Sequence, residues 1–256
     1  MRKIVIANQK GGVGKTTTAV NLAVGLAKAG EQVLLADMDP QANTTFAILG
    51  KKEPKATAYD VLINDMSLQE VIIPTSEKRL DLLPSDIDLA GAEVELVTEI
   101  GGQTRLRTKF ATSKDLDYDF IIIDTPPSLG LLTINSLAAA DEILVPVSAS
   151  IFALKGIAQL EKTIEKVKVN LQCPNLRITG ALITMYDHTN VAKDVITAIE
   201  RHFGEVTFKT VIPKNVKLEE AHSRAESVFT YAPSSRGAEA YTALVEEVIK
   251  RGAKEA

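Results

Sequence analysis

The sequence predicts an α/β fold, with a single doubly wound, mostly parallel sheet flanked by helices. Short apolar runs alternate along the chain with longer segments of helical pattern, the order expected of repeated βαβ units. The runs are apolar at successive positions, as strands of a parallel sheet are when both faces are buried. In 256 residues with 45% hydrophobic side chains, we expect a single domain spanning residues 1–256.

Five apolar runs are predicted to be strands, and the segments around them helices. The strands are expected at residues 4–7, 33–36, 120–123, 143–147 and 178–183. The main helices are expected at residues 16–29, with Gly30 as C-cap, and at 131–140, 155–169 and 237–251. Residues 51–114 have the weakest pattern, and short helices are expected there at 59–63 and 90–99. Ligands of such a sheet bind beyond the carboxyl ends of its strands.

Composition and charge exclude several classes of protein. With 29 Lys and Arg against 33 Asp and Glu, the net charge is −4, so nucleic acid could be contacted only through a local basic patch. The single cysteine, Cys173, excludes an intrachain disulfide and a multi-cysteine metal site. There is no apolar run of about 18 residues and no signal peptide, so we expect a cytoplasmic protein.

A glycine-rich segment, Asn-Gln-Lys-Gly-Gly-Val-Gly-Lys-Thr-Thr, follows the first predicted strand and opens the first helix. Its glycines let backbone N–H groups turn toward one anion, and the helix N-terminus adds its dipole. Lys15 can reach the β- and γ-phosphates of a nucleotide, and the Thr16 hydroxyl can ligate Mg²⁺. The ordinary P-loop requires glycine where this chain has Gln9. We still interpret the segment as a nucleotide-binding loop formed by Gly11, Gly12, Val13, Gly14, Lys15, Thr16 and Thr17.

Lys10 is not needed to cradle the phosphates, because Lys15 already does so. With a lysine at this position, the loop resembles that of the deviant Walker A family, which includes ParA, MinD and the nitrogenase iron protein. The resemblance extends over essentially the whole chain and is closest to short ParA/Soj-type partition ATPases. It implies ATP as the nucleotide, and it implies that Lys10 crosses a homodimer interface to the partner's nucleotide.

Acidic residues end two of the predicted strands and would face the phosphates. Asp37 and Asp39 are two residues apart, so both point to the same side of an extended chain. The family resemblance assigns Asp39 to orienting the attacking water and Asp37 to the hydrated Mg²⁺ shell. Asp124 follows an apolar strand, as in the Walker B pattern, and would hold Mg²⁺ through water. Residues 125–128 would form a switch segment that senses the γ-phosphate.

The resemblance also suggests a base pocket and a DNA-binding surface. Met185 and Pro213 are expected to be walls of the adenine pocket. Between Lys193 and Lys217 there are five basic and three acidic residues, and Soj-type proteins bind DNA nonspecifically through basic residues around this part of the chain. The candidate DNA contacts are Lys193, Arg201, Lys214 and Lys217.

The predicted function is that of an ATP-driven positioning ATPase. Its ATP-bound sandwich dimer would bind nucleoid DNA nonspecifically, and a ParB-like or other partner on the cargo would stimulate slow hydrolysis. One alternative is a MinD-like, membrane-associated ATPase that regulates the placement of a division site or cargo. Against it, residues 246–256 lack a bulky apolar face, so we expect a docked helix with a frayed tail and no membrane binding. A third reading, a metal-cluster carrier ATPase, is disfavoured by the single cysteine.

Overall fold

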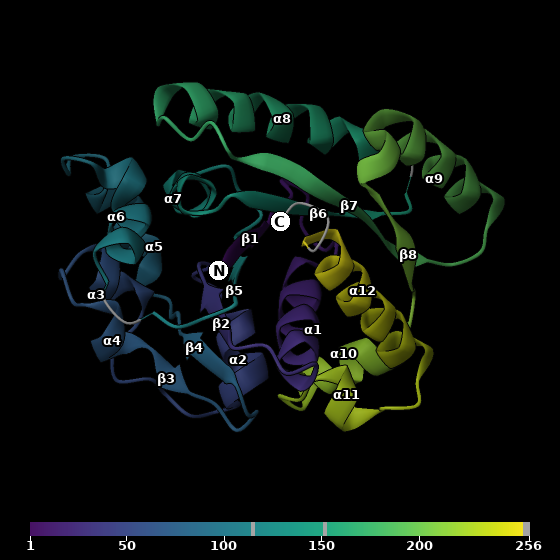
Figure 1. Ribbon diagram of the computed structural model, residues 1–256, viewed down its shortest axis with the longest axis horizontal. Helices are drawn as coiled ribbons and strands as arrows, with labels where there is room; N and C mark the ends of the chain where they lie inside the picture. The colour runs from purple at the N-terminus through teal and green to yellow at the C-terminus, as the bar shows by residue number, and fades with distance from the viewer. Residues whose placement is uncertain (114–115, 151–152, 253–256) are drawn as a thin grey trace.

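The computed structural model describes residues 1–113, 116–150 and 153–252, and it confirms the predicted α/β architecture. The strands form one eight-stranded sheet in the order β3-β4-β2-β5-β1-β6-β7-β8 (Figure 1). Neighbouring strands are parallel throughout, except that β3 pairs antiparallel with β4. The strands are Arg2–Ile6 (β1), Val33–Asp37 (β2), Ile73–Pro74 (β3), Leu80–Leu83 (β4), Phe120–Asp124 (β5), Glu142–Ser148 (β6), Arg177–Tyr186 (β7) and Thr207–Pro213 (β8).

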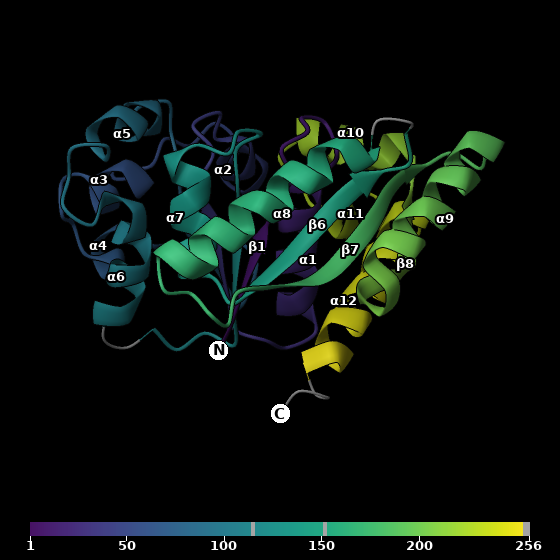
Figure 2. The ribbon, with the colours of Figure 1, turned by 90° about the horizontal axis from the view of Figure 1, so that it is seen from above.

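Helices cover both faces of this sheet (Figures 1 and 2). Helices α7 and α8 lie on one face, and α1 and α12 pack together on the other. The helices are Lys15–Lys28 (α1), Asn43–Leu49 (α2), Ala58–Leu62 (α3), Leu68–Val71 (α4), Leu89–Glu95 (α5), Arg105–Thr112 (α6), Leu131–Ala139 (α7), Ala153–Asn170 (α8), Asn190–Phe203 (α9), Val216–Ser223 (α10), Val228–Tyr231 (α11) and Arg236–Gly252 (α12).

The central strands divide their side chains between two hydrophobic cores. In β1, Val5 belongs to the core beneath α7 and α8, whereas Ile4 and Ile6 belong to the core beneath α1 and α12. This follows from the two-residue period of a strand, whose successive side chains point to opposite faces. All of these side chains are buried, which explains why the strand is apolar at successive positions.

The five predicted strands and the four main helices are confirmed, with ends that differ by a few residues. Two details were wrong. The C-cap of α1 is Ala29, and Gly30 follows it with a left-handed φ of 106°. The helix expected at residues 90–99 ends at Glu95, and the chain then turns so that Gly102 packs against the backbone of Leu96, where a Cβ would not fit. The predicted frayed tail at residues 253–256 lies outside the described residues.

Candidate functional site

The carboxyl ends of the central strands bring the predicted site segments together. Strand β5 lies between β1 and β2, so Asp124 is the register partner of Ile6 on one side and of Asp37 on the other. The glycine-rich loop leaves β1 at this edge, and the Asp39 segment leaves β2 beside it. Parallel pairing therefore gathers residues that are far apart in the sequence at one edge of the sheet.

The glycine-rich loop has the backbone conformation that an anion cradle requires. Gly12 and Gly14 have φ values of 66° and 83°, in the left-handed region where a side chain would be strained. Gly14 is the N-cap of α1 and provides no side-chain acceptor, and the first turn of the helix contains no acidic residue. The N-terminal N–H groups of α1 thus have no capping side chain, which suits them to phosphate.

Lys15 places a buried positive charge at the mouth of this helix. Its side chain is largely buried, and its Nζ lies 3.5 Å from the carbonyl oxygen of Lys10. It forms no ion pair with any carboxylate in the described part of the chain. Burial lowers the pKa of Lys15, while the charges of Asp124 and Asp39 act in the opposite direction. A buried, unpaired ammonium group fits an anionic ligand.

Asp124 and Thr16 together provide oxygen atoms suited to Mg²⁺. One carboxylate oxygen of Asp124, Oδ2, accepts hydrogen bonds from the hydroxyls of Thr16 and Thr44, each at 2.8 Å. Burial raises the pKa of Asp124 to about 6, although these hydrogen bonds and Lys15 oppose the shift. No cluster of three or more His, Cys, Asp or Glu side chains that could hold a metal occurs among the described residues. Mg²⁺ commonly keeps several waters and takes one or two carboxylates plus substrate phosphate, and Asp124 and Thr16 provide oxygen atoms of this kind.

Asp37 is bound by the start of α2. It is fully buried and accepts hydrogen bonds from the backbone N–H of Thr45 at 2.8 Å and from its hydroxyl at 2.7 Å. Burial, together with the charge of Asp124, raises the pKa of Asp37 to about 7. Asp39, also buried, accepts a hydrogen bond from the N–H of Gln41. The assignment of Asp37 to the Mg²⁺ shell and of Asp39 to the attacking water remains a prediction.

Three residues that support these carboxylates were missed in the sequence. Thr44 binds Asp124, Thr45 binds Asp37, and the Ser85 hydroxyl donates to the carbonyl oxygen of Asp39 at 2.9 Å. The available signal was a pair of threonines at the start of a helix directly after an acidic turn. Ser85 follows β4, which the sequence did not predict, so no signal pointed to it.

Lys10 lies against the end of β6 within its own chain. Its Nζ donates to the hydroxyl of Ser150 at 2.7 Å and lies 3.5 Å from that of Ser148. Both partners are neutral, so the ammonium charge remains uncompensated by any carboxylate in the residues described. The predicted reach of Lys10 to a partner's nucleotide therefore remains a prediction, and it would require the side chain to leave these hydroxyls.

A hollow of about 80 Å³ beside the loop contains both predicted base-pocket residues. Met185 and Pro213 line it together with Gly14, Thr17 and Tyr241. The Thr184 hydroxyl donates to the carbonyl oxygen of Val13 at 2.9 Å, which ties the end of β7 to the glycine-rich loop. The structure thus brings Met185 and Pro213 next to the glycine-rich loop, and their role as walls of an adenine pocket remains a prediction.

The four predicted DNA contacts do not form one compact cluster. Helix α9 runs from the carboxyl edge back toward the amino edge (Figure 2), so Arg201 lies about 12 Å further along the helix than Lys193. Lys214 is at the carboxyl edge, where its N–H donates to the carbonyl oxygen of Tyr186. Lys217 is ion-paired with Glu220 at 2.7 Å. Lys193 and Lys214 thus both start from the carboxyl edge, and the DNA-binding role of all four remains a prediction.

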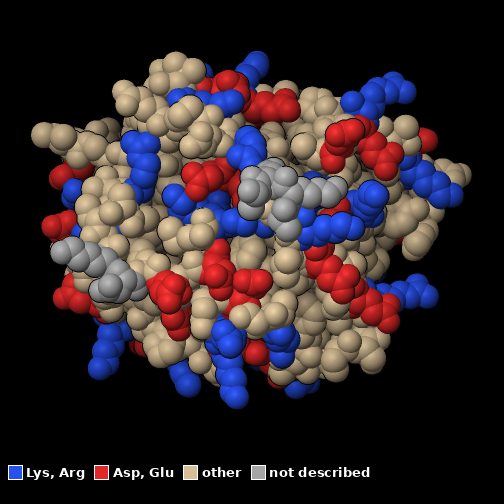
Figure 3. Space-filling model, viewed as in Figure 1, with Lys and Arg blue, Asp and Glu red and all other residues tan. Residues whose placement is uncertain are grey.

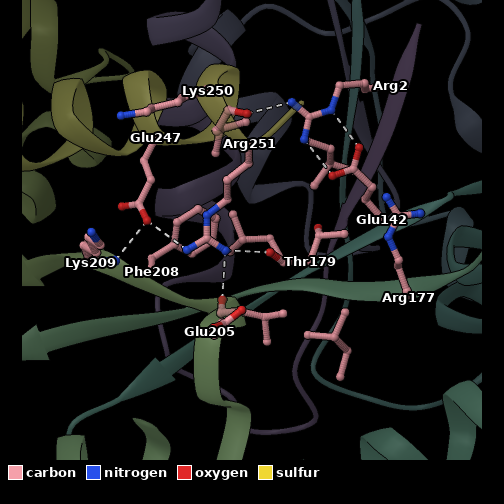
Figure 4. A pocket seen from close by; sticks show the side chains of 15 residues that line it. Arg2, Glu142, Arg177, Thr179, Glu205, Phe208, Lys209, Glu247, Lys250 and Arg251 are labelled. Atoms are coloured by element: carbon pink, nitrogen blue, oxygen red, sulfur yellow. Dashed lines mark hydrogen bonds and ion pairs between the residues drawn. The ribbon is translucent and has the colours of Figure 1, made fainter. Parts of the chain in front are cut away.

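A second, larger hollow of about 510 Å³ lies at the amino edge of the sheet (Figure 4). Its central charges are already matched: Arg2 forms two 2.7 Å hydrogen bonds with the carboxylate of Glu142, and Arg251 pairs with Glu247 at 2.8 Å. Arg251 also donates to three carbonyl oxygens and lies over the ring of Phe208. On the face seen in Figure 3, basic and acidic side chains are interspersed. These contacts stabilise the amino edge of the sheet. Among its described lining residues, this hollow has no glycine-rich loop of the kind found at the carboxyl edge.

Comparison with known sequences relates the chain to partition proteins. The AAA_31 family model, described as an AAA domain, matches residues 1–178. The sporulation initiation inhibitor protein Soj of Bacillus subtilis is 46% identical over 251 residues, covering 97% of this chain and 98% of that protein. The chromosome partitioning protein ParA of Myxococcus xanthus is 46% identical over 253 residues, covering 98% of this chain and 88% of that protein.

Solved structures with the same fold include nucleotide complexes. A Mycobacterium smegmatis protein named cobyrinic acid a,c-diamide synthase, with an ATP analogue and magnesium, is 33% identical, with a TM-score of 0.85 over 100% of this chain and 97% of that one. A putative plasmid partition protein of Borrelia burgdorferi bound to AMPPNP is 26% identical, with a TM-score of 0.83 over 98% and 99%. The cell division ATPase MinD of Pyrococcus furiosus is 30% identical, with a TM-score of 0.76 over 97% and 98%.

Proposed function

This chain belongs to the ParA/Soj family of partition ATPases, and from that premise we propose that its ATP-bound form is a sandwich dimer that binds DNA nonspecifically and is stimulated by a partner on the cargo. The chain is an ATPase that uses ATP and Mg²⁺, as its relatives and the nucleotide complexes of its structural neighbours indicate. The single observation that carries the proposal is Lys10, a cation beside the phosphate cradle whose Nζ contacts serine hydroxyls and no carboxylate within the residues that the structure describes.

The residues of the cradle have distinct parts in hydrolysis. Lys15 and the N-terminal N–H groups of α1 would neutralise the β- and γ-phosphates, which is the main contribution a protein makes to phosphoryl transfer. Asp39 would orient the attacking water. Mg²⁺, held by Thr16 and Asp124, would offset negative charge on the phosphate oxygens. Asp37, held by its hydrogen bonds to the start of α2, would belong to the hydrated Mg²⁺ shell.

The proposed dimer would complete this site. Lys10 would exchange the Ser148 and Ser150 hydroxyls for the phosphates of the other protomer's nucleotide. A charge-assisted contact in a poorly hydrated interface is stronger than a bond between the half-buried ammonium of Lys10 and a neutral hydroxyl. ATP would therefore favour the closed dimer, and Lys10→Ala should weaken dimerisation more than it weakens nucleotide binding by one protomer.

DNA binding is proposed to depend on this dimer. Each protomer would present Lys193 and Lys214 from its carboxyl edge, so dimerisation would double the number of cations on one surface. Phosphate contacts made by such lysines carry no sequence information, and they would localise the protein to the nucleoid. Lys217 would contribute after release from Glu220, whereas Arg201 lies further from this edge.

Binding to random duplex DNA, measured by fluorescence anisotropy with ATP, ADP or no nucleotide, tests the proposal. We expect tight binding with ATP alone, and each neutralised phosphate should add about 0.9 to the slope of log affinity against log salt. The Lys193→Glu/Lys214→Glu variant should lose DNA binding but retain ATP-dependent dimerisation in light scattering. DNA binding by that variant equal to wild type would refute the assigned surface.

The same protein sample can be used to test the alternative function, that of a MinD-like membrane-associated ATPase. This alternative is supported by the similarity to MinD structures. No helix within the described residues is long and apolar enough to cross a bilayer. Peripheral attachment is tested by sedimentation with anionic liposomes in the presence of ATP. If the protein sediments with liposomes and does not bind DNA, the proposed partition function is wrong and the membrane-associated function takes its place.

A further inference from the structure

Four large apolar side chains are exposed on α5 and in the segments directly before and after it. Ten such side chains are exposed in the residues that the structure describes, and four of them lie within residues 87–100. Their exposed fractions are high: 66% for Ile87, 75% for Val94, 71% for Val97 and 97% for Ile100. We call these four residues the α5 patch. Exposed apolar side chains that gather in this way mark interaction surfaces, because their burial by a partner is favourable.

The charged side chains of the segment that carries the α5 patch, residues 86–100, all have one sign. Residues 86–100 contain five acidic side chains and no Lys or Arg. Asp88, Glu95 and Glu99 are exposed among the apolar residues. The one ion pair of these three residues in the described chain joins Glu99 to Arg105 at 3.9 Å. A partner that covers the patch should therefore combine apolar side chains with basic ones.

Helix α5 also contacts the start of α7. The carboxylate of Glu93 lies against Gly130, where a Cβ would clash with it, and its Oε1 accepts a hydrogen bond from the N–H of Leu132 at 3.5 Å. Gly130 and Leu132 are the N-cap and second residue of α7. A shift of α5 would therefore act directly on the N-terminus of α7.

The start of α7 is in turn linked to the glycine-rich loop. The Thr133 hydroxyl donates to the carbonyl oxygen of Ser128 at 2.6 Å, which fixes the end of the predicted switch segment. A Cβ on Gly11 would lie 3.8 Å from the Cβ of Pro127, so the switch segment and the loop are in van der Waals proximity. Contacts thus lead from α5 through the start of α7 to the switch segment, which lies beside the glycine-rich loop.

We propose that the α5 patch is the docking surface of the stimulating partner, that the partner presents a basic amphipathic segment to it, and that Glu93 transmits the contact through the start of α7 to the switch segment. This inference rests on the proposed function, because it names the surface that the cargo-bound partner uses. Docking buries the four apolar side chains and pairs the acidic rim with lysine or arginine. Glu93 acts as a positioning residue, since it acts through Gly130 and Leu132 at the start of α7.

Charge argues against two other occupants of the patch. A second copy related by two-fold symmetry would place the same acidic segment opposite itself, which is repulsive. DNA would bring phosphates to a rim of carboxylates, which is also repulsive. A basic amphipathic segment satisfies both the apolar centre and the acidic rim.

Docking is tested with a synthetic amphipathic helical peptide of leucine and lysine, and with a leucine–glutamate peptide of the same pattern as control. Binding to the nucleotide-free full chain is measured by fluorescence anisotropy. The Val94→Lys/Val97→Lys variant should bind the leucine–lysine peptide about tenfold more weakly or worse. The Val169→Lys/Val191→Lys variant adds the same charge at two exposed valines of α8 and α9, and its affinity should stay within about twofold of wild type.

Hydrogen exchange then locates the contact. Peptide binding should slow exchange at residues 86–100 and at 128–134 in the wild type. Equal binding by the Val94→Lys/Val97→Lys variant and its control, or protection confined to another surface, would overturn the docking assignment. Loss of ATP-dependent dimerisation in that variant, by light scattering, would overturn it in favour of a second copy. These measurements fail independently of the proposed function, which is tested by ATP-dependent DNA binding.

Transmission is tested with Glu93→Gln, which keeps the size of the side chain and removes its charge. The leucine–lysine peptide should increase the ATPase rate of the wild type severalfold and should not increase that of the variant. The variant should still bind the peptide within about twofold of the wild-type affinity and keep its basal rate. Exchange at residues 128–134 should no longer respond to the peptide. A variant stimulated as strongly as wild type would overturn the role of Glu93.

Discussion

The two edges of the sheet use the same kinds of charged residue in opposite ways. At the amino edge, Arg2 and Arg251 are each bound by a carboxylate and by backbone carbonyl oxygens. At the carboxyl edge, Lys15 is buried without an ion pair in the described chain, and the buried carboxylates of Asp37 and Asp124 are held only by hydroxyl and amide groups. The ion-paired residues of the amino edge have a structural role. The buried charged residues of the carboxyl edge, which lack such partners, are suited to binding a ligand of opposite charge.

Because its buried charged groups lack ion-pair partners, the carboxyl edge lowers the stability of the fold when no nucleotide is bound. Burial raises the pKa of Asp37 to about 7 and that of Asp124 to about 6, and it lowers the pKa of Lys15. Each shift means that the folded environment disfavours the charged form. Nucleotide and Mg²⁺ would supply the missing partners, so binding should stabilise the fold as well as start the reaction.

The largest expected effect comes from removing the unmatched cation. Lys15→Ala should weaken Mg-ATP binding by about a hundredfold, or about 2.7 kcal/mol, because a charge-assisted phosphate contact is lost. Isothermal titration calorimetry with Mg²⁺ measures this. The matched cation provides the comparison: Arg2→Ala should leave the ATP affinity within about twofold of wild type. Similar losses in both variants would contradict the distinction between the edges.

A comparable loss, confined to catalysis, is expected at Asp39. Asp39→Ala should bind ATP with near wild-type affinity but hydrolyse it about a hundredfold more slowly, because the group that orients the water is gone. Phosphate release and calorimetry on the same preparation separate the two quantities. Turnover at the wild-type rate would show that another residue positions the water.

Removing the ion pair between Arg2 and Glu142 should lower the free energy of unfolding without changing the affinity for ATP. Glu142 is almost fully buried and binds Arg2 through both carboxylate oxygens. Glu142→Ala should lower the free energy of unfolding by about 2 kcal/mol, because it leaves a partly buried guanidinium without its partner. Urea denaturation measures this, and calorimetry should find the ATP affinity unchanged. Weaker ATP binding in this variant would mean that the amino edge is coupled to the site.

The unmatched carboxylates of the carboxyl edge should also make the stability of the fold depend on pH. The raised pKa of Asp37 means that its folded form holds a proton over a pH range in which the unfolded form has lost it. The free energy of unfolding without nucleotide should therefore fall as pH rises from about 4 to about 7, by at most about 1.4 kcal/mol per pH unit for one proton. Asp37→Asn should flatten this dependence in urea titrations. An equally steep dependence in the variant would assign it to other groups.

The nucleotide site could be predicted from the sequence because its signals are local. The glycine-rich loop and Lys15 are contiguous, and Asp124 directly follows an apolar strand. The supporting residues could not be found this way, since Thr44 lies 80 positions from its partner Asp124. Only parallel pairing of β2 with β5 brings those two residues together.

The missed elements had mixed or interrupted patterns. Strand β8 reads Thr-Phe-Lys-Thr-Val-Ile-Pro and lies at an edge of the sheet, where polar residues are tolerated. Strand β4 is only four residues long and contains Asp81. Helix α5 was expected to continue to residue 99, but it ends at Glu95, and Val97 and Ile100 beyond its end are exposed. Apolar pattern alone does not distinguish a core face from a docking face.

The central strands contribute side chains to two separate cores, and this has a consequence for the evolution of such a protein. A substitution at Val5 alters packing on the side that holds α7 and the buried residues of α5, whereas a substitution at Ile6 alters the side that holds α1 and Tyr241. The first side leads to the docking surface proposed above, and the second leads to the hollow that is proposed to hold the base. Substitutions at these two neighbouring positions could therefore change stimulation by a partner and nucleotide affinity independently of each other during evolution.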